Sequence, residues 1–168
     1  MVGRSFCLKR LVVLALVFVA GCQTTQRNLP KSTFQFYLES ENTTRNGFWS
    51  ATATLPISKL TFNICPHPVL FAGDLECARL ATSHFGKCIF FQLSQRAAVE
   101  LYKISVECGG RRMIFSFNDQ VLGLSLPIEN AISNDTLTIF PEVEEEALDS
   151  LIVEINDCIA KLKKMKKD

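Results

Sequence analysis

The stretch RMIFSFNDQVLGLSL, residues 112–126, decides the fold of this chain. Met113, Phe115 and Phe117 recur at every second position, which is the period of a β-strand with one buried face. Asn118-Asp119-Gln120 then turns the chain into a second strand over Val121–Leu126. The stretch therefore predicts a β-hairpin.

Further strands are predicted on both sides of this hairpin. Phe34, Phe36 and Leu38 alternate over residues 33–38, and residues 136–140 form a short apolar run. Two more strands are expected near 49–55 and 59–65, the second ended by prolines that cannot donate to a ladder. The aromatic run 87–93 predicts a buried, central strand, whereas residues 75–83 fit either a short helix or a strand.

Two helices are predicted. Ser94 is a suitable N-cap for a helix that runs to Cys108 and ends at two glycines. The second helix is expected to begin at Pro141, with glutamates at its start and lysines at its end. Its buried stripe comprises Ala147, Leu151, Ile155, Ile159 and Leu162. The elements predict a single α+β domain over residues 33–168, with an antiparallel sheet and two helices packed on one face.

The N-terminus is typical of an exported protein. A basic start, with Arg4, Lys9 and Arg10, precedes an apolar run over 11–20 that is too short to span a bilayer. The run ends in Val19-Ala20-Gly21-Cys22, which resembles the lipobox of bacterial lipoproteins. We therefore expect residues 1–21 to be a signal peptide cleaved between Gly21 and Cys22, with Cys22 acylated and residues 22–32 forming a flexible tether.

The expected location is the bacterial cell envelope, with the lipid anchor holding the domain on the periplasmic side of a membrane. Gln23 follows the acylated cysteine, and the absence of Asp at that position favours the outer membrane. Durable anchoring needs more than one acyl chain, and lipoproteins of this type resemble one another in carrying three.

The charge composition argues against a nucleic-acid partner. The 168 residues include 18 Lys and Arg against 17 Asp and Glu, which is not the balance of a nucleic-acid-binding protein. Five lysines lie among the last eight residues. Two interpretations of this basic tail remain open: it matches the dipole at a solvated helix end, or it contacts anionic lipid headgroups.

Catalytic signals are weak. The glycines do not form a phosphate-binding loop, and no Gly-X-Ser-X-Gly elbow occurs, so we expect no catalytic residue, no cofactor and no enzymatic activity. One cluster of cysteines and histidines offers potential metal ligands, although its spacing matches no zinc module. The cysteines could equally be small buried side chains that bind nothing. The members of the cluster are Cys65, His67, Cys77, His84 and Cys88. With Cys108 and Cys158, five cysteines follow Cys22, so at least one must stay free or pair with another chain.

The order of elements from Pro68 to about Ile155 resembles the head subdomain of the first periplasmic domain of SecD, a membrane protein that assists protein export. The shared features are an aliphatic-Ala-Gly-Asp turn, a buried strand and helix, a Gly-Arg segment, a hairpin and a Ser-X-Pro triplet. In this sequence they are Val69–Asp74, Leu75–Ala78, Leu93, Ala97, Ala98, Leu101, Gly109–Arg112, Phe117–Leu122, Ser125-Leu126-Pro127 and Leu137–Phe140, followed by the helix with Ala147.

The resemblance implies an α+β periplasmic binding module and transfers no site residue. The hairpin turn Asn118-Asp119-Gln120 lacks the glycine that the family has there. Since the membrane helices of SecD have no counterpart in the sequence, its proton-coupled activity is not expected. The leading hypothesis is a lipid-anchored envelope protein with a non-catalytic module that binds a protein partner. The alternatives are a metal-binding or thiol-redox protein and a structural subunit of an envelope assembly.

Overall fold

The computed structural model describes residues 31–40 and 51–166. The proposed signal peptide, the Gly21–Cys22 cleavage site and residues 22–30 of the tether lie outside these residues. The described chain forms nine strands, one 3₁₀ turn and two helices. In chain order they are β1 (Phe34–Leu38), β2 (Ala51–Thr54), β3 (Thr61–Ile64), β4 (Leu70–Phe71), η1 (Ala72–Asp74), β5 (Leu75–Ser83), β6 (Gly86–Leu93), α2 (Gln95–Glu107), β7 (Met113–Phe117), β8 (Gln120–Leu124), β9 (Thr136–Pro141) and α3 (Glu145–Met165).

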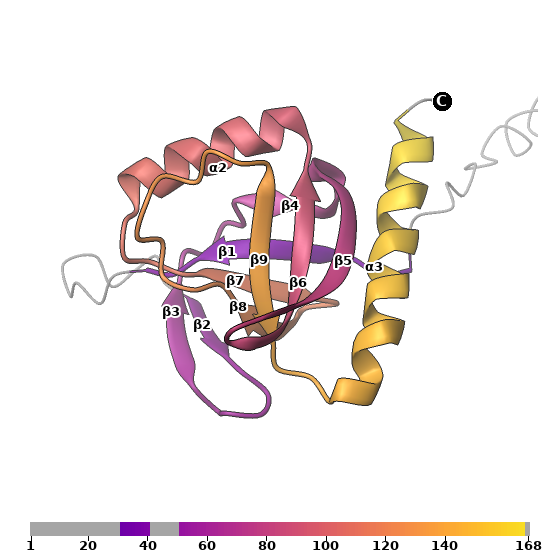
Figure 1. Cartoon of the computed structure of the whole chain (residues 1–168), viewed down its shortest axis with the longest axis horizontal. Helices are drawn as coiled ribbons and strands as arrows, with labels where there is room; N and C mark the ends of the chain where they lie inside the picture. The colour runs from indigo at the N-terminus through magenta and orange to yellow at the C-terminus, as the bar shows by residue number, and fades with distance from the viewer. Residues whose placement is uncertain (1–30, 41–50, 167–168) are drawn as a thin grey trace, which may run out of the picture.

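Seven strands form one antiparallel sheet in the order β4-β1-β7-β8-β9-β6-β5. The sheet curls, so that strands from its two halves face each other across the core (Figure 1). The ring centroid of Phe91 on β6 lies 5.0 Å from that of Phe36 on β1 and 5.2 Å from that of Phe115 on β7. Residue alternation puts these phenylalanines on the inner face of their strands. The predicted α+β class is confirmed, and the curl is the feature that the sequence did not reveal.

The two halves of the sheet join where β8 meets β9, through only two residue pairs, Gly123 with Pro141 and Leu124 with Phe140. The backbones approach closely there. A Cβ atom on Gly123 would lie 2.5 Å from the carbonyl oxygen of Phe140 and 2.9 Å from Cα of Pro141. Glycine at position 123 is therefore needed for the junction that closes the curl.

Both helices pack against the same core. Ala97 and Leu101 of α2 and Leu151 and Ile155 of α3 belong to one cluster with the inner-face phenylalanines. As predicted, the Ser94 hydroxyl accepts a hydrogen bond from the Ala97 N–H and caps α2. Both helices contact the inner side of the curled sheet, as expected of helices packed on one face.

The predicted start of the second helix is wrong by four residues. Pro141 is the last residue of β9, where it pairs with Gly123, and α3 begins at Glu145. The predicted buried stripe is confirmed at Leu151, Ile155 and Ile159, which are buried. Ala147 is exposed, and Leu148 is buried in its place. The pairing with β8 keeps the proline in the sheet, although its local preference suits a helix start.

The edge strand β5 is covered by α3. The side-chain amide of Asn156 accepts a hydrogen bond from the Ala78 N–H and donates one to the Ala78 carbonyl, both at 2.9 Å. The amide thus occupies the hydrogen-bonding positions that a neighbouring strand would use, which protects an edge that could otherwise pair with another chain. Residues 75–83, for which the sequence allowed a helix or a strand, form the strand β5. β6, predicted to be buried and central, lies one place from the edge, and Phe90 on its outer face is exposed.

The hairpin β2–β3 forms a separate two-stranded sheet. Ala53 and Ile64 from this hairpin pack with Ile114 on the outer face of β7. All five residues of β7 are consequently buried, because the core covers one face and the hairpin the other.

The turn between β7 and β8 needs no glycine. Asn118 and Asp119 have φ values of 49° and 63°, so both adopt the left-handed conformation of a two-residue type I′ turn. Asn and Asp tolerate this conformation better than other non-glycine residues. The predicted hairpin is confirmed. Asn118 and Asp119 also explain how the turn forms without the glycine that SecD has at this place.

We expect the Gly123→Ala variant to lose about 1–3 kcal/mol of unfolding free energy, because the added methyl group must displace the β9 backbone. Urea unfolding followed by circular dichroism measures the loss. Gly109→Ala is the matched control, since a Cβ there would meet nothing nearer than the Ile128 carbonyl at 3.9 Å. Equal stability of the two variants would contradict the proposed role of the close approach.

A carboxylate fixes the tip of the β2–β3 hairpin. Glu142 Oε2 accepts hydrogen bonds from the backbone N–H groups of Ile57 at 3.2 Å and Ser58 at 2.9 Å. Burial alone would raise the pKa of Glu142, but the hydrogen bonds from Ser58 and Ile57 and the charge of Lys59 together lower it. The charged form is therefore the one that holds the hairpin.

This lowered pKa predicts a pH dependence. The contact contributes its full stability above the ordinary glutamate pKa and loses it as the pH falls through the lowered pKa of the folded state. In NMR titrations the Ser58 amide shift should follow this transition, with a midpoint below the ordinary glutamate pKa. Glu142→Gln keeps an acceptor oxygen without the charge, so the variant should lack the transition. A wild-type midpoint above the ordinary glutamate value would refute the assignment.

Candidate functional site

A groove lies on the outer face of β6 and β9 and has a volume of about 650 Å³. Outward-facing side chains of the two strands form its floor, including Phe90, Thr138 and Phe140. The β5–β6 turn borders it with His84 and Phe85, and the segment 125–134 supplies further lining that includes Leu126. The volume is within the range of protein ligand sites.

Several aromatic and aliphatic side chains in the groove are exposed. Phe85 is 72% exposed, Leu126 45% and Phe90 37%. The Phe85 ring meets the Phe140 ring edge-on, with centroids 6.1 Å apart. Such a set of apolar side chains without a cover is typical of an interaction site.

The pairing of β6 with β9 explains why these side chains face outward. Phe90 is opposite Thr138 in the ladder, while their neighbours Ile89 and Ile139 are paired on the inner face. The sequence predicts a buried strand over 87–93 and does not single out Phe90 as exposed. The two-residue period of the strand was the available signal, because buried Ile89 and Phe91 cannot both be on the face that Phe90 occupies.

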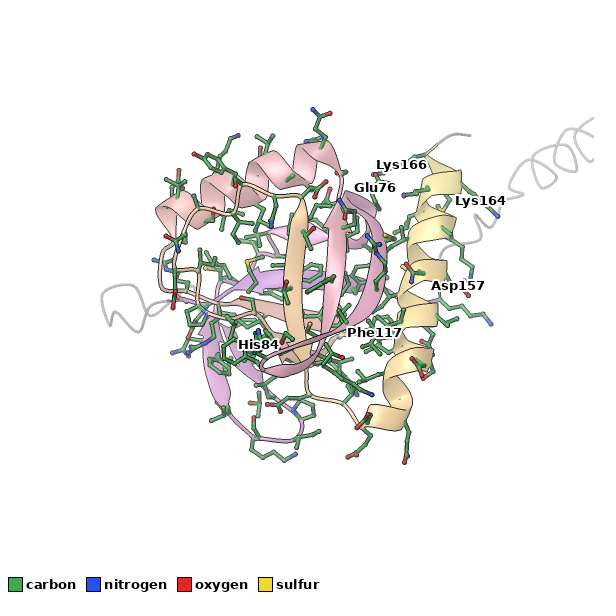
Figure 2. All side chains as sticks on the ribbon, viewed as in Figure 1. Glu76, His84, Phe117, Asp157, Lys164 and Lys166 are labelled. Carbon is green, nitrogen blue, oxygen red and sulfur yellow. The ribbon has the colours of Figure 1, made fainter. Side chains whose placement is uncertain are left out.

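The predicted cysteine and histidine cluster is dispersed in the structure. Cys65 follows β3 and packs on the main core, and His67 is exposed in the next loop. Cys77 pairs with Gln92 and Cys88 with Ala81, so these two cysteines lie at different levels of the β5–β6 ladder. His84 lies at the β5–β6 turn, as Figure 2 shows. Within residues 31–40 and 51–166, no three His, Cys, Asp or Glu side chains are grouped closely enough to hold a metal ion.

The five described cysteines are free thiols, and two of them are buried. Burial raises the pKa of Cys88, partly offset by a hydrogen bond with Ser83. Burial also raises the pKa of Cys158, partly offset by the charge of Lys161. A redox nucleophile needs the opposite shift together with access to solvent, so neither environment favours thiol chemistry.

In the part of the chain that the structure describes, no helix combines the length and the apolar character needed to cross a membrane. No protein-family model matches the chain. No curated protein matches it in sequence.

Two solved structures of SecDF share the fold. One is of SecDF as a membrane component that enhances protein export; the match has a TM-score of 0.54 and 15% sequence identity, and it covers 77% of this chain and 62% of that one. The other is of SecDF in a super-membrane-facing form, with the same TM-score and identity over 77% of this chain and 19% of that one. This chain therefore spans less than two thirds of either SecDF chain. The matches agree with the resemblance to SecD at the level of the fold.

Proposed function

We propose that this chain is a lipid-anchored protein of the bacterial cell envelope, whose α+β domain binds an apolar segment of a protein partner in the β6–β9 groove without catalysing a reaction. The observation that carries the proposal is the set of uncovered apolar side chains in that groove. The fold shared with SecDF, which enhances protein export, supports a role that involves other proteins.

The composition of the groove favours a polypeptide over a charged small molecule. Among the described residues that line it, Glu129 is the only Asp, Glu, Lys or Arg. The threonine and asparagine side chains around the aromatic rings can hydrogen-bond to an extended backbone, while Phe85, Phe90 and Leu126 receive apolar side chains. This combination of apolar contacts and a few polar groups is typical of peptide and ligand sites.

The anchor rests on the sequence Val19-Ala20-Gly21-Cys22 after a basic start and an apolar run. We expect the protein expressed with its own N-terminus to partition into the membrane fraction and to carry an acylated Cys22. Cys22→Ala should abolish acylation and, with it, cleavage between Gly21 and residue 22. Mass spectrometry of the N-terminal peptide, together with fractionation, measures both effects. An unmodified N-terminus on membrane-free wild-type protein would reject the anchor.

Groove binding is tested with a permanently unfolded probe, reduced and carboxymethylated α-lactalbumin, in fluorescence anisotropy. We expect Phe90→Ser and Phe85→Ser each to weaken binding roughly tenfold or more, because burying one aromatic ring is worth about 1.5–3 kcal/mol. Their stability should change little, since both side chains are already partly or largely exposed.

Ile57→Ser is the matched control, because Ile57 is 57% exposed at the β2–β3 tip and does not line the groove. A photo-crosslinking residue at position 90 should capture an envelope protein in cells, whereas one at position 57 should not. If Ile57→Ser weakens probe binding as much as Phe85→Ser does, the groove is not the binding site.

A further inference from the structure

The helix α2 has a second apolar stripe that faces away from the core. Val99, Tyr102 and Val106 are 51%, 47% and 57% exposed, and their spacing places them on one helical face. On the same helix Glu100 and Lys103 form an ion pair at 2.9 Å, which leaves little net charge beside the stripe. Exposed valines and a tyrosine on a helix suit the boundary between water and lipid, where an apolar face is buried among headgroups.

The helix α3 is strongly polarised along its length. Glu145 and Glu146 lie in its first turn, and Lys163 and Lys164 in its last. Lys163 pairs with Glu76, and Lys166 donates to the Gly73 carbonyl at 2.7 Å. Lys161 and Lys164 are exposed, and none of the ion pairs recorded among the described residues includes either of them.

The lysine end of α3 and the start of α2 both contact η1. Lys166 contacts Gly73 of η1, and the N–H of Ser94, which caps α2, donates to the carbonyl of Asp74 in η1 at 2.8 Å. Phe71, directly before η1, is 50% exposed. Figure 1 shows α2 lying across the end of the sheet toward which the C-terminus of α3 points. Figure 2 shows Lys164 and Lys166 at this end and His84 at the other.

The opposite end of the domain carries more acidic than basic side chains, because four glutamates there outnumber Lys59 and Lys87. There Glu142 holds the β2–β3 tip, and Glu145 pairs with Lys87 beside the β5–β6 turn. Exposed Glu144 and Glu146 add to the negative charge. A surface of anionic headgroups would repel this end and attract the lysine end.

The chain enters the domain beside the middle of α3. The Cys158 thiol donates to the Ser32 carbonyl at 3.0 Å, and Lys31 lies in a small pocket with Asp157 and Lys161. Cys22 is nine residues before Lys31, so an anchor at Cys22 would keep this entry point within about 30 Å of the bilayer. That reach allows either end of α3 to approach the membrane. An anionic surface would attract the lysine end and repel the glutamate end.

We propose that the end of the domain formed by the exposed α2 stripe, Phe71 and the α3 lysines rests on an anionic phospholipid surface, with the two hairpin tips directed away from it. The proposal rests on the lipid anchor of the proposed function. Asp157 lies about 10 Å from Lys164 along the helix, which exceeds the screening length at physiological salt. It is only one turn from Lys161 and shares a small pocket with it, so Lys164 contributes more of the attraction than Lys161.

The test is lysine acetylation of the lipidated full chain in vesicles, read by mass spectrometry. In vesicles of phosphatidylcholine with phosphatidylglycerol, we expect labelling of Lys161 and Lys164 to fall several-fold relative to vesicles of phosphatidylcholine alone. Lys59 at the β2–β3 tip is the internal control and should label equally in both. Equal labelling of all three lysines in both vesicles would overturn the membrane face while leaving the anchor in place.

A variant separates charge from lipidation. The chain from residue 22 onward carrying Cys22→Ala, and therefore neither the lipid nor the apolar run 11–20, should co-float with phosphatidylglycerol vesicles. The further change of Lys161 and Lys164 to Gln should reduce that partition by up to roughly 25-fold, at about fivefold per lysine. Lys59→Gln is the matched control and should have little effect. Failure of the unlipidated chain to co-float, or equal losses with Lys59→Gln, would overturn the proposal whether or not Cys22 is acylated.

Discussion

The close approach of β8 to β9 at Gly123 is the constraint on which the rest of the structure depends. Only two residue pairs connect the two halves of the sheet, and one of them places Gly123 against Pro141. With no side chain in the way, the backbones can approach closely enough for the sheet to turn back on itself. The curl brings Phe91 of one half into contact with Phe36 and Phe115 of the other, so the aromatic contacts between the two halves depend on this junction.

The curl also determines which surfaces need a cover and which remain open. The edge strand β5 is covered by α3, where Asn156 satisfies both backbone groups of Ala78. The outer face of β7 is covered by the β2–β3 hairpin, which Glu142 holds at its tip. The outer face of β6 and β9 has no comparable cover, which leaves the exposed rings of Phe85 and Phe90 in a groove. The proposed binding site is thus the part of the sheet that neither a helix nor the hairpin protects.

α3 contributes to the core and also carries opposite charges at its two ends. Its buried stripe contributes to the core through residues such as Ile155, and its exposed side carries charge of opposite sign at its two termini. Dipole matching explains why glutamates lie at the start of a helix and lysines at its end, and it is a local effect. The lysine end also contacts η1, and α2 begins on the other side of η1. A membrane-facing end and a protein-binding groove would lie on different parts of the domain, which is consistent with a tethered binding module.

The sequence by itself determined the local structure: the strand periods around Phe34 and Phe115, the Ser94 cap and the α+β class. These follow from interactions between residues that are close in the chain, such as side-chain alternation and capping. It misplaced the start of α3, because the pairing of Pro141 with Gly123 outweighs the local preference of proline for a helix start. Only the tertiary structure decided the curl, the exposure of Phe90 and the placement of η1 between the start of α2 and the lysine end of α3. Each of these depends on contacts between segments far apart in the sequence, and a one-dimensional pattern does not record which face of a strand or helix another segment will cover.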